Sequence, residues 1–151
     1  MAAETNRVGW SRRTLQILVG LNALLAVYKG GAFVVLGIDG VSLVAGAEGP
    51  LDVAEPARAL LDTWVRVLGW NWLAIGLMAG WIVPGIERHT AWFRLIHVGF
   101  MAVGVGRLSA LVASGPDPSH AAWHILVELA VPLGFIAWQT QVAHAAARPL
   151  R

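Results

Sequence analysis

Polar and turn-forming residues divide this chain into four long apolar runs. The runs predict helices over 14–37, 58–83, 90–113 and 119–146. Each run is long enough to cross about 30 Å of hydrocarbon, for which an α-helix needs about 20 apolar residues. Pro84-Gly85 ends the second run, and a Gly-Pro-Asp-Pro turn at 115–118 separates the last two. The pattern predicts an all-α fold: an integral membrane four-helix bundle with up-down-up-down connections, in a single domain covering 1–151.

The stretch from Ile38 to Ala57 lacks a long apolar run. Hydropathy falls there, and glycine, proline and acidic residues accumulate, with Asp39, Glu48 and Asp52 among them. We therefore predict a loop of about 20 residues, which is longer than most helix connections. Such a loop would either fold over the mouth of the bundle or be mobile.

The third run contains three glycines, Gly99, Gly104 and Gly106, which leave parts of the helix surface without side chains. Small residues let membrane helices approach one another closely. We predict that these glycines are packing positions rather than ligand contacts.

The composition places the chain in the membrane class, because 57% of its 151 residues are hydrophobic and only 13% are charged. Cysteine is absent from the sequence, which excludes disulfides, thiolate metal sites and Fe–S clusters. The formal net charge of +2 is small and reflects arginines near the termini, so we expect no nucleic-acid partner. The expected partners are the lipid bilayer and other membrane-protein subunits.

Arginines in the tails and connections predict how the chain lies in the membrane. On the side of the N-terminus there are seven, against one in the other two loops. The seven are Arg7, Arg12, Arg13, Arg88, Arg94, Arg148 and Arg151, and the one is Arg58. Positive residues collect on the cytoplasmic side of membrane proteins. We therefore expect a bacterial inner-membrane protein with both termini in the cytoplasm and with 38–57 and 115–118 facing outward.

Six ionisable residues interrupt the apolar runs: Lys29, Asp62, Arg66, Arg107, His124 and Glu128. Counted from the outer ends of their helices, they lie about 8 to 13 Å deep, with Asp62 shallower. Charges inside apolar helices cost about 2.5 to 3.5 kcal/mol each by insertion scales, so they are rarely placed there without a partner or a task. We predict one polar layer in the outer leaflet, where three cations face two carboxylates and leave one positive charge in excess.

Two interpretations of this layer stay open. In the structural one, Asp62 pairs with Arg66 at i, i+4, while Lys29 extends to the surface. Arg107 then pairs with Glu128 across the turn and fixes the helix register. In the other, a crevice binds a small anionic or amphiphilic molecule such as a lipid headgroup or a quinone, because a surplus cation in a low-dielectric site favours an anion.

The histidines suggest a metal or haem site, but their spacing gives it little support. His120, His124 and Glu128 follow one helix face at i, i+4 and i+8, as metal ligands on helices do, yet the sequence has no HExxH motif. His97 and His124 lie about 16 Å apart along the helix axes, too far to share one haem. The sequence also shows no nucleophile with an adjacent base. We expect no metal and no cofactor other than a bound lipid or quinone, and catalysis has no positive support in the sequence.

The motif Gly106-Arg107-Leu108, followed by a Gly-Pro turn and by Glu128, resembles an uncharacterised bacterial family of small four-helix integral membrane proteins, a domain of unknown function. The resemblance covers 13–145, and in architecture the chain is also similar to DoxX-like four-helix membrane proteins. Lys29 and the Trp-rich WVRVLGWNW of the second run differ from both groups. The resemblance implies the fold and no activity.

The function expected from the sequence is therefore that of a structural or accessory component of a membrane assembly. A binder of a small anionic or amphiphilic molecule is the alternative. A membrane enzyme or transporter is third, since four short helices without repeats offer little for alternating access.

Overall fold

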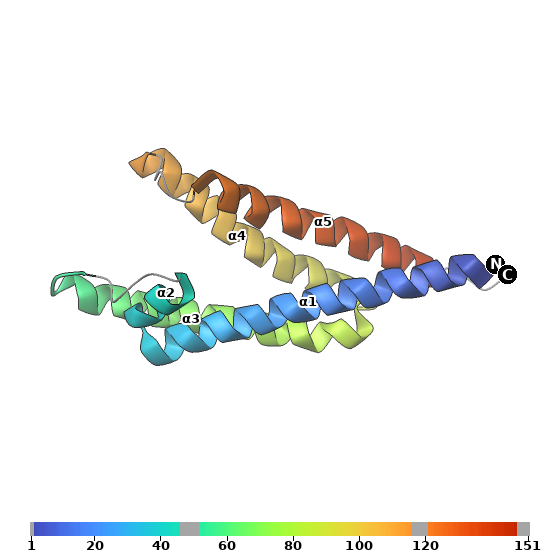
Figure 1. The fold of residues 1–151 in the computed structure, drawn as a ribbon, viewed down its shortest axis with the longest axis horizontal. Coiled ribbons are helices and arrows are strands. Elements are labelled where there is room, and N and C mark those ends of the chain that lie inside the picture. Colours follow the sequence, from blue (N-terminus) through green and yellow to red (C-terminus); the bar gives the residue numbers. More distant parts are fainter. Residues whose placement is uncertain (1, 46–51, 116–120, 148–151) are drawn as a thin grey trace. The chain divides into compact units, whose positions relative to one another are not determined.

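Five α-helices and one short 3₁₀ turn form the computed structural model, which describes residues 2–45, 52–115 and 121–147 (Figure 1). The helices are α1 (Ala2–Leu36), α2 (Ile38–Ala45), α3 (Ala57–Ile82), α4 (Thr90–Ser114) and α5 (Ala121–Ala147), and the turn η1 is Val83–Gly85. Within these ranges, α1, α3, α4 and α5 are long and apolar enough to cross a membrane. The predicted all-α class and its four membrane-length helices are therefore confirmed, whereas the up-down connections stay a prediction.

The chain divides into two compact units. The central unit is Val19–Trp81, and the terminal unit joins Met1–Leu18 to Ile82–Arg151. The central unit thus holds the second part of α1, all of α2 and nearly all of α3. The terminal unit holds the start of α1 together with α4 and α5. That the whole chain acts as one domain stays a prediction.

A short helix, α2, occupies the first part of the predicted loop, so the loop prediction was wrong over Ile38–Ala45. Ile38 and Ser42 are buried one turn apart on the same face, while Leu43 points outward. Asp39 in the first turn suits the positive end of the helix dipole. An eight-residue helix is hidden when hydropathy is averaged over a window that also includes the acidic residues after it. Glu48 lies outside the described residues.

Close contact between helix backbones holds α1 against α3 in the central unit. A Cβ atom at Gly30 would lie 2.5 Å from the backbone nitrogen of Leu73, and one at Gly76 would lie 2.8 Å from the backbone nitrogen of Val27. Gly69 makes a similar approach to α1. Only residues without a side chain allow this spacing. Sequence analysis placed its packing glycines in the third run alone and missed this contact.

In the terminal unit, α4 and α5 lie side by side (Figure 1). A Cβ atom at Gly104 would lie 3.1 Å from the Cβ atom of Glu128, so Gly104 is a packing position as predicted. The prediction was wrong for Gly106, where a Cβ atom would meet nothing within 4 Å in the described part of the chain. Two residues turn an α-helix by about 200°, so Gly104 and Gly106 face opposite sides. For Gly99 the role stays a prediction.

The first helix begins at Ala2, well before the apolar run predicted to start at residue 14. Two residues of its polar start, Ser11 and Arg12, make tertiary contacts within the terminal unit. The indole Nε1–H of Trp138 donates a hydrogen bond of 2.7 Å to the hydroxyl of Ser11, and Arg12 bonds to Glu87. Polar contacts, rather than a buried apolar face, therefore connect this part of α1 to the rest of the terminal unit.

Candidate functional site

Asp62 and Arg66 form the predicted i, i+4 ion pair, and they also clamp the corner between α1 and α2. Arg66 Nε donates to Asp62 Oδ2 at 2.7 Å. The same guanidinium donates from Nη1 to the carbonyl oxygens of Val34 at 2.6 Å and Val35 at 3.3 Å. Asp62 Oδ1 accepts the backbone N–H of Ile38 at 2.9 Å. A cation thus faces the carbonyl end of α1 and an anion faces the N–H end of α2, which matches both helix dipoles.

Gly37 makes this corner possible. Its φ of +59° lies in the left-handed region, which glycine adopts without the cost that a side chain imposes. A Cβ atom there would also collide with Asp62 Oδ1. A second ion pair, from Arg58 Nη2 to Asp39 Oδ1 at 2.7 Å, ties the start of α3 to the first turn of α2. Two ion pairs therefore fix the position of α2, although sequence analysis found only one of them.

Lys29 differs from the arginines of the central unit. Its Nζ lies 5.8 Å from the ring centroid of Trp72, a cation–π contact between α1 and α3. Among the residues that the structure describes, no carboxylate lies within ion-pair distance of this ammonium. Asp39 and Asp62 are paired with arginines, so Lys29 is the cation on the helices of the central unit that no described carboxylate neutralises.

Arg107 and Glu128 form the predicted ion pair between α4 and α5. Arg107 Nε lies 3.0 Å from Oε1 and 2.9 Å from Oε2 of Glu128, and only Oε1 accepts a hydrogen bond. The Arg107 side chain is 48% exposed and that of Glu128 is 23% exposed. Glu128 Oε2 is buried and has no hydrogen-bond donor in the described ranges. The pair joins α4, seven residues before its end at Ser114, to α5, seven residues after its start at Ala121.

The six predicted site residues fall into two groups. Lys29, Asp62 and Arg66 belong to the central unit, and Arg107, His124 and Glu128 belong to the terminal unit. A single layer made by both groups stays a prediction. His120 of the weak metal candidate lies outside the described residues, and no three histidine or acidic residues gather as a metal site within the described ranges.

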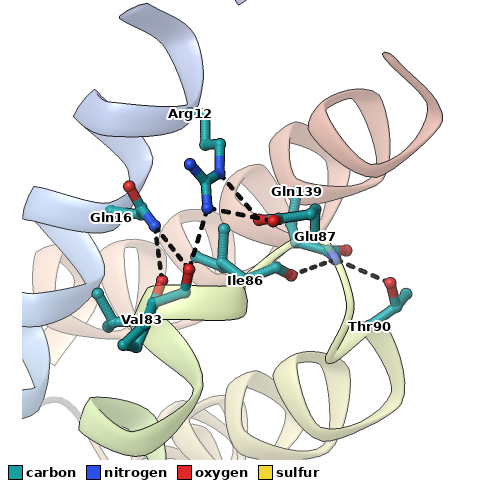
Figure 2. Close-up of polar contacts among 8 residues, drawn as sticks. Arg12, Gln16, Val83, Ile86, Glu87, Thr90 and Gln139 are labelled. Atoms are coloured by element: carbon teal, nitrogen blue, oxygen red, sulfur yellow. Dashed lines mark hydrogen bonds and ion pairs between the residues drawn. The ribbon is translucent and has the colours of Figure 1, made fainter. Parts of the chain in front are cut away.

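A polar cluster that sequence analysis missed surrounds the connection between α3 and α4 (Figure 2). Arg12 from α1 donates from Nε to Glu87 Oε2 at 2.9 Å and from Nη2 to Oε1 at 3.1 Å, a bidentate pair. Its Nη2 also donates to the carbonyl oxygen of Pro84 at 3.0 Å, and Gln16 Nε2 donates to that of Val83 at 2.8 Å. The side chains of α1 thus satisfy carbonyl groups of η1, the 3₁₀ turn that follows α3.

Gln139 completes the cluster from α5. It is fully buried, and its Nε2 donates at 2.9 Å to the carbonyl oxygen of Ile86 and at 2.9 Å to the hydroxyl of Thr90 (Figure 2). Side chains from two helices, α1 and α5, therefore bond to the same connection, and Gln139 also bonds to Thr90 at the start of α4. These bonds satisfy the amide NH₂ of the buried glutamine, whereas its Oε1 is buried without a hydrogen-bond donor among the described residues.

Glu87 lies between the spans Ala57–Gly85 and Thr90–Ala113. Partial burial raises the pKa of Glu87, but the hydrogen bond and positive charge of Arg12, with the charge of Arg88, lower it by more. The pKa of Glu87 therefore lies below its ordinary value, and the carboxylate is ionised at neutral pH.

His97 is a buried polar residue that fits neither the layer nor the cluster. Its Nδ1 lies 2.8 Å from the carbonyl oxygen of Phe93, and because a carbonyl only accepts, Nδ1 carries the proton. The ring stacks on Phe93 with centroids 4.1 Å apart and meets Phe135 of α5 edge-on at 5.5 Å. The histidine thus serves as an aromatic packing residue between α4 and α5.

Four membrane-length helices, with their embedded charges paired mostly within the protein, define a small multi-pass membrane protein. The model of the Domain of unknown function (DUF4345) matches residues 14–139, so the chain belongs to this family. Comparison with curated proteins and with solved structures found no match. The predicted membership of an uncharacterised membrane family is confirmed. Likeness to DoxX and the Gly-Arg-Leu to Glu hallmark stay predictions.

Proposed function

We propose that this protein is a non-enzymatic structural or accessory component of a membrane assembly. The observation that carries the proposal is the use of the embedded arginines. Arg66 is bonded to Asp62 and to the end of α1, and Arg107 is bonded to Glu128. Groups that a catalytic or transport site would need are thereby used to hold helices together.

The sides of the long helices support the same proposal. Large apolar side chains point outward from all four, among them Leu24, Leu77, Val112 and Trp123. Such surfaces contact lipid tails, and part of them would contact a partner subunit in an assembly.

Extraction of the tagged full chain from native membranes into polymer-bounded lipid discs tests the accessory role. We expect a second membrane protein to be recovered in about equal molar amount, as identified by mass spectrometry. An unrelated four-helix protein with the same tag is the control. Recovery of the chain with lipid alone, at native expression level, would contradict the proposal.

We also propose a bacterial inner-membrane location with both termini in the cytoplasm, on the basis of the seven arginines against one. A reporter that fluoresces only in the cytoplasm should be bright when fused to either end of the chain. Darkness at one end would show that the orientation is wrong.

A second candidate function is the binding of a small anionic or amphiphilic molecule, such as a lipid headgroup or a quinone. The specific observation in its favour is Lys29, whose positive charge is not neutralised by a described carboxylate. An ammonium in an apolar helix favours an anion beside it.

A further inference from the structure

The charges on the helices of the central unit neutralise one another except at one position. Arg58 pairs with Asp39, and Arg66 pairs with Asp62. Lys29 contacts an aromatic ring instead. From this imbalance we propose that Lys29 and Trp72 bind the phosphate of an anionic phospholipid headgroup. The proposal deepens the binding function stated second above and does not depend on the accessory role.

The position of Lys29 along α1 suits a headgroup. The span Gly9–Leu36 has 28 residues and is therefore about 42 Å long, some 12 Å more than the hydrocarbon core. Lys29 precedes Leu36 by seven residues, or about 10 Å. With the excess length shared between the two ends, the Lys29 backbone lies about 4 Å inside the hydrocarbon boundary. A lysine side chain of about 6 Å covers that distance and brings its ammonium to the phosphates.

The Trp72 ring contacts the lysine ammonium at this level. Tryptophan prefers the boundary between hydrocarbon and headgroups, where its ring is in apolar surroundings and its N–H is near polar ones. The face of its ring attracts the ammonium, but a cation–π contact leaves the positive charge in place. An anion is still needed to neutralise the charge, and the phosphodiester is the anion that a bilayer supplies at this depth.

The net charge of the headgroup decides which phospholipid is favoured. A zwitterionic headgroup such as phosphatidylcholine brings its own cation to the phosphate, whereas phosphatidylglycerol does not. Arg107 offers no equivalent excess charge, because Glu128 neutralises it. Selectivity for anionic lipid should therefore depend on Lys29 and not on Arg107.

Native mass spectrometry of the full chain in a neutral detergent, with phosphatidylglycerol or phosphatidylcholine added, tests the site. The wild type should retain phosphatidylglycerol in preference to phosphatidylcholine. Lys29→Gln should lower that preference about fivefold, the factor expected for one lysine near an anionic membrane surface. Lys29→Arg should keep it, and Arg107→Gln is the matched control that should leave it unchanged. An unchanged preference in Lys29→Gln, or an equal loss in Arg107→Gln, would overturn the proposal.

Inorganic phosphate separates a lipid headgroup from a free anion. We expect millimolar phosphate neither to displace phosphatidylglycerol nor to raise the melting temperature in detergent. Equal stabilisation by phosphate and by phosphatidylglycerol would show a site for a free anion and would refute the lipid assignment. Lipid-free Lys29→Gln should melt at or above the wild-type temperature. A large fall would reveal a partner for Lys29 within the protein and would equally refute it.

Discussion

Arg66 in the central unit and Arg107 in the terminal unit each bond to a carboxylate, at 2.7 and 3.0 Å, yet they use their other N–H groups differently. Arg66 also donates to two carbonyl oxygens at the end of α1, and its partner Asp62 accepts the first N–H of α2. Arg107 donates to Glu128 alone within the described ranges. The first pair therefore replaces backbone hydrogen bonds at a corner, whereas the second only joins two helices. An ion pair that satisfies backbone groups should be harder to remove than one that does not.

The largest effect is expected at the corner. Arg66→Gln should lower the melting temperature in detergent by several degrees, because it leaves Asp62 without its cation and two carbonyl groups of α1 without a donor. An isolated i, i+4 pair would contribute much less. Arg66→Lys is the control, since it keeps the positive charge but replaces the planar guanidinium, with its several N–H donors, by a single ammonium. A change of less than a degree in Arg66→Gln would show that the corner does not depend on the clamp.

The pair between α4 and α5 should give a smaller loss. Arg107→Gln or Glu128→Gln alone should each cost about 1 to 3 kcal/mol of unfolding free energy, between the values of exposed and buried pairs, because Arg107 is 48% exposed. The double variant should cost less than the two losses added together. A double-mutant cycle by thermal unfolding measures this, and strictly additive losses would mean that the side chains do not interact.

A pH-dependent effect of at most about 1 kcal/mol is expected from Glu87, because Arg12 is partly exposed. The pKa of Glu87 is lowered in the folded protein, so its contribution is complete above the unfolded value of 4.5 and is lost as the pH falls through the lower folded value. Glu87→Gln should therefore reduce stability at pH 7 and leave it nearly unchanged at pH 3. An equal loss at both pH values would contradict the role of the charge.

The smallest effect on stability is expected at Lys29, the charge without a described carboxylate. Lys29→Gln should leave the melting temperature in lipid-free detergent unchanged or slightly raised, because no described carboxylate loses its partner and no lipid phosphate is present. The melting temperature of Arg107→Gln is measured in the same buffer for comparison. If Lys29→Gln lowered the melting temperature as much as Arg107→Gln does, Lys29 would have a stabilising partner within the protein.

The four long helices could be predicted because each depends on an apolar run that the sequence shows directly. The start of α1 and the whole of α2 could not. Residues 2–13 are too polar to be recognised as helical, and the tertiary contacts of Ser11 and Arg12 are with residues far along the chain. For α2, eight residues beside an acidic stretch give too short a signal.

The polar contacts also divide into those that could be predicted from the sequence and those that could not. Asp62 and Arg66 are 4 positions apart, and Arg107 and Glu128 are 21 positions apart across a predicted Gly-Pro-Asp-Pro turn, so both pairs could be predicted from spacing. Glu87 bonds to a residue 75 positions away, and the hydrogen bond between Gln139 and Thr90 spans 49 positions. Contacts over such separations depend on how helices pack, which spacing along the chain does not reveal.

Because Arg12 and Glu87 are far apart in the sequence, Arg12 is synthesised well before its ion-pair partner. At about 5 to 20 residues per second, Glu87 is made about 4 to 15 s after Arg12, which it follows by 75 residues. In that interval Arg12 has not yet met its carboxylate, and its positive charge is available to orient α1 during insertion. If the proposed orientation holds, the same guanidinium would first be a topological signal and later, once the connection after α3 exists, a hydrogen-bond donor to the carbonyl group of Pro84 in η1.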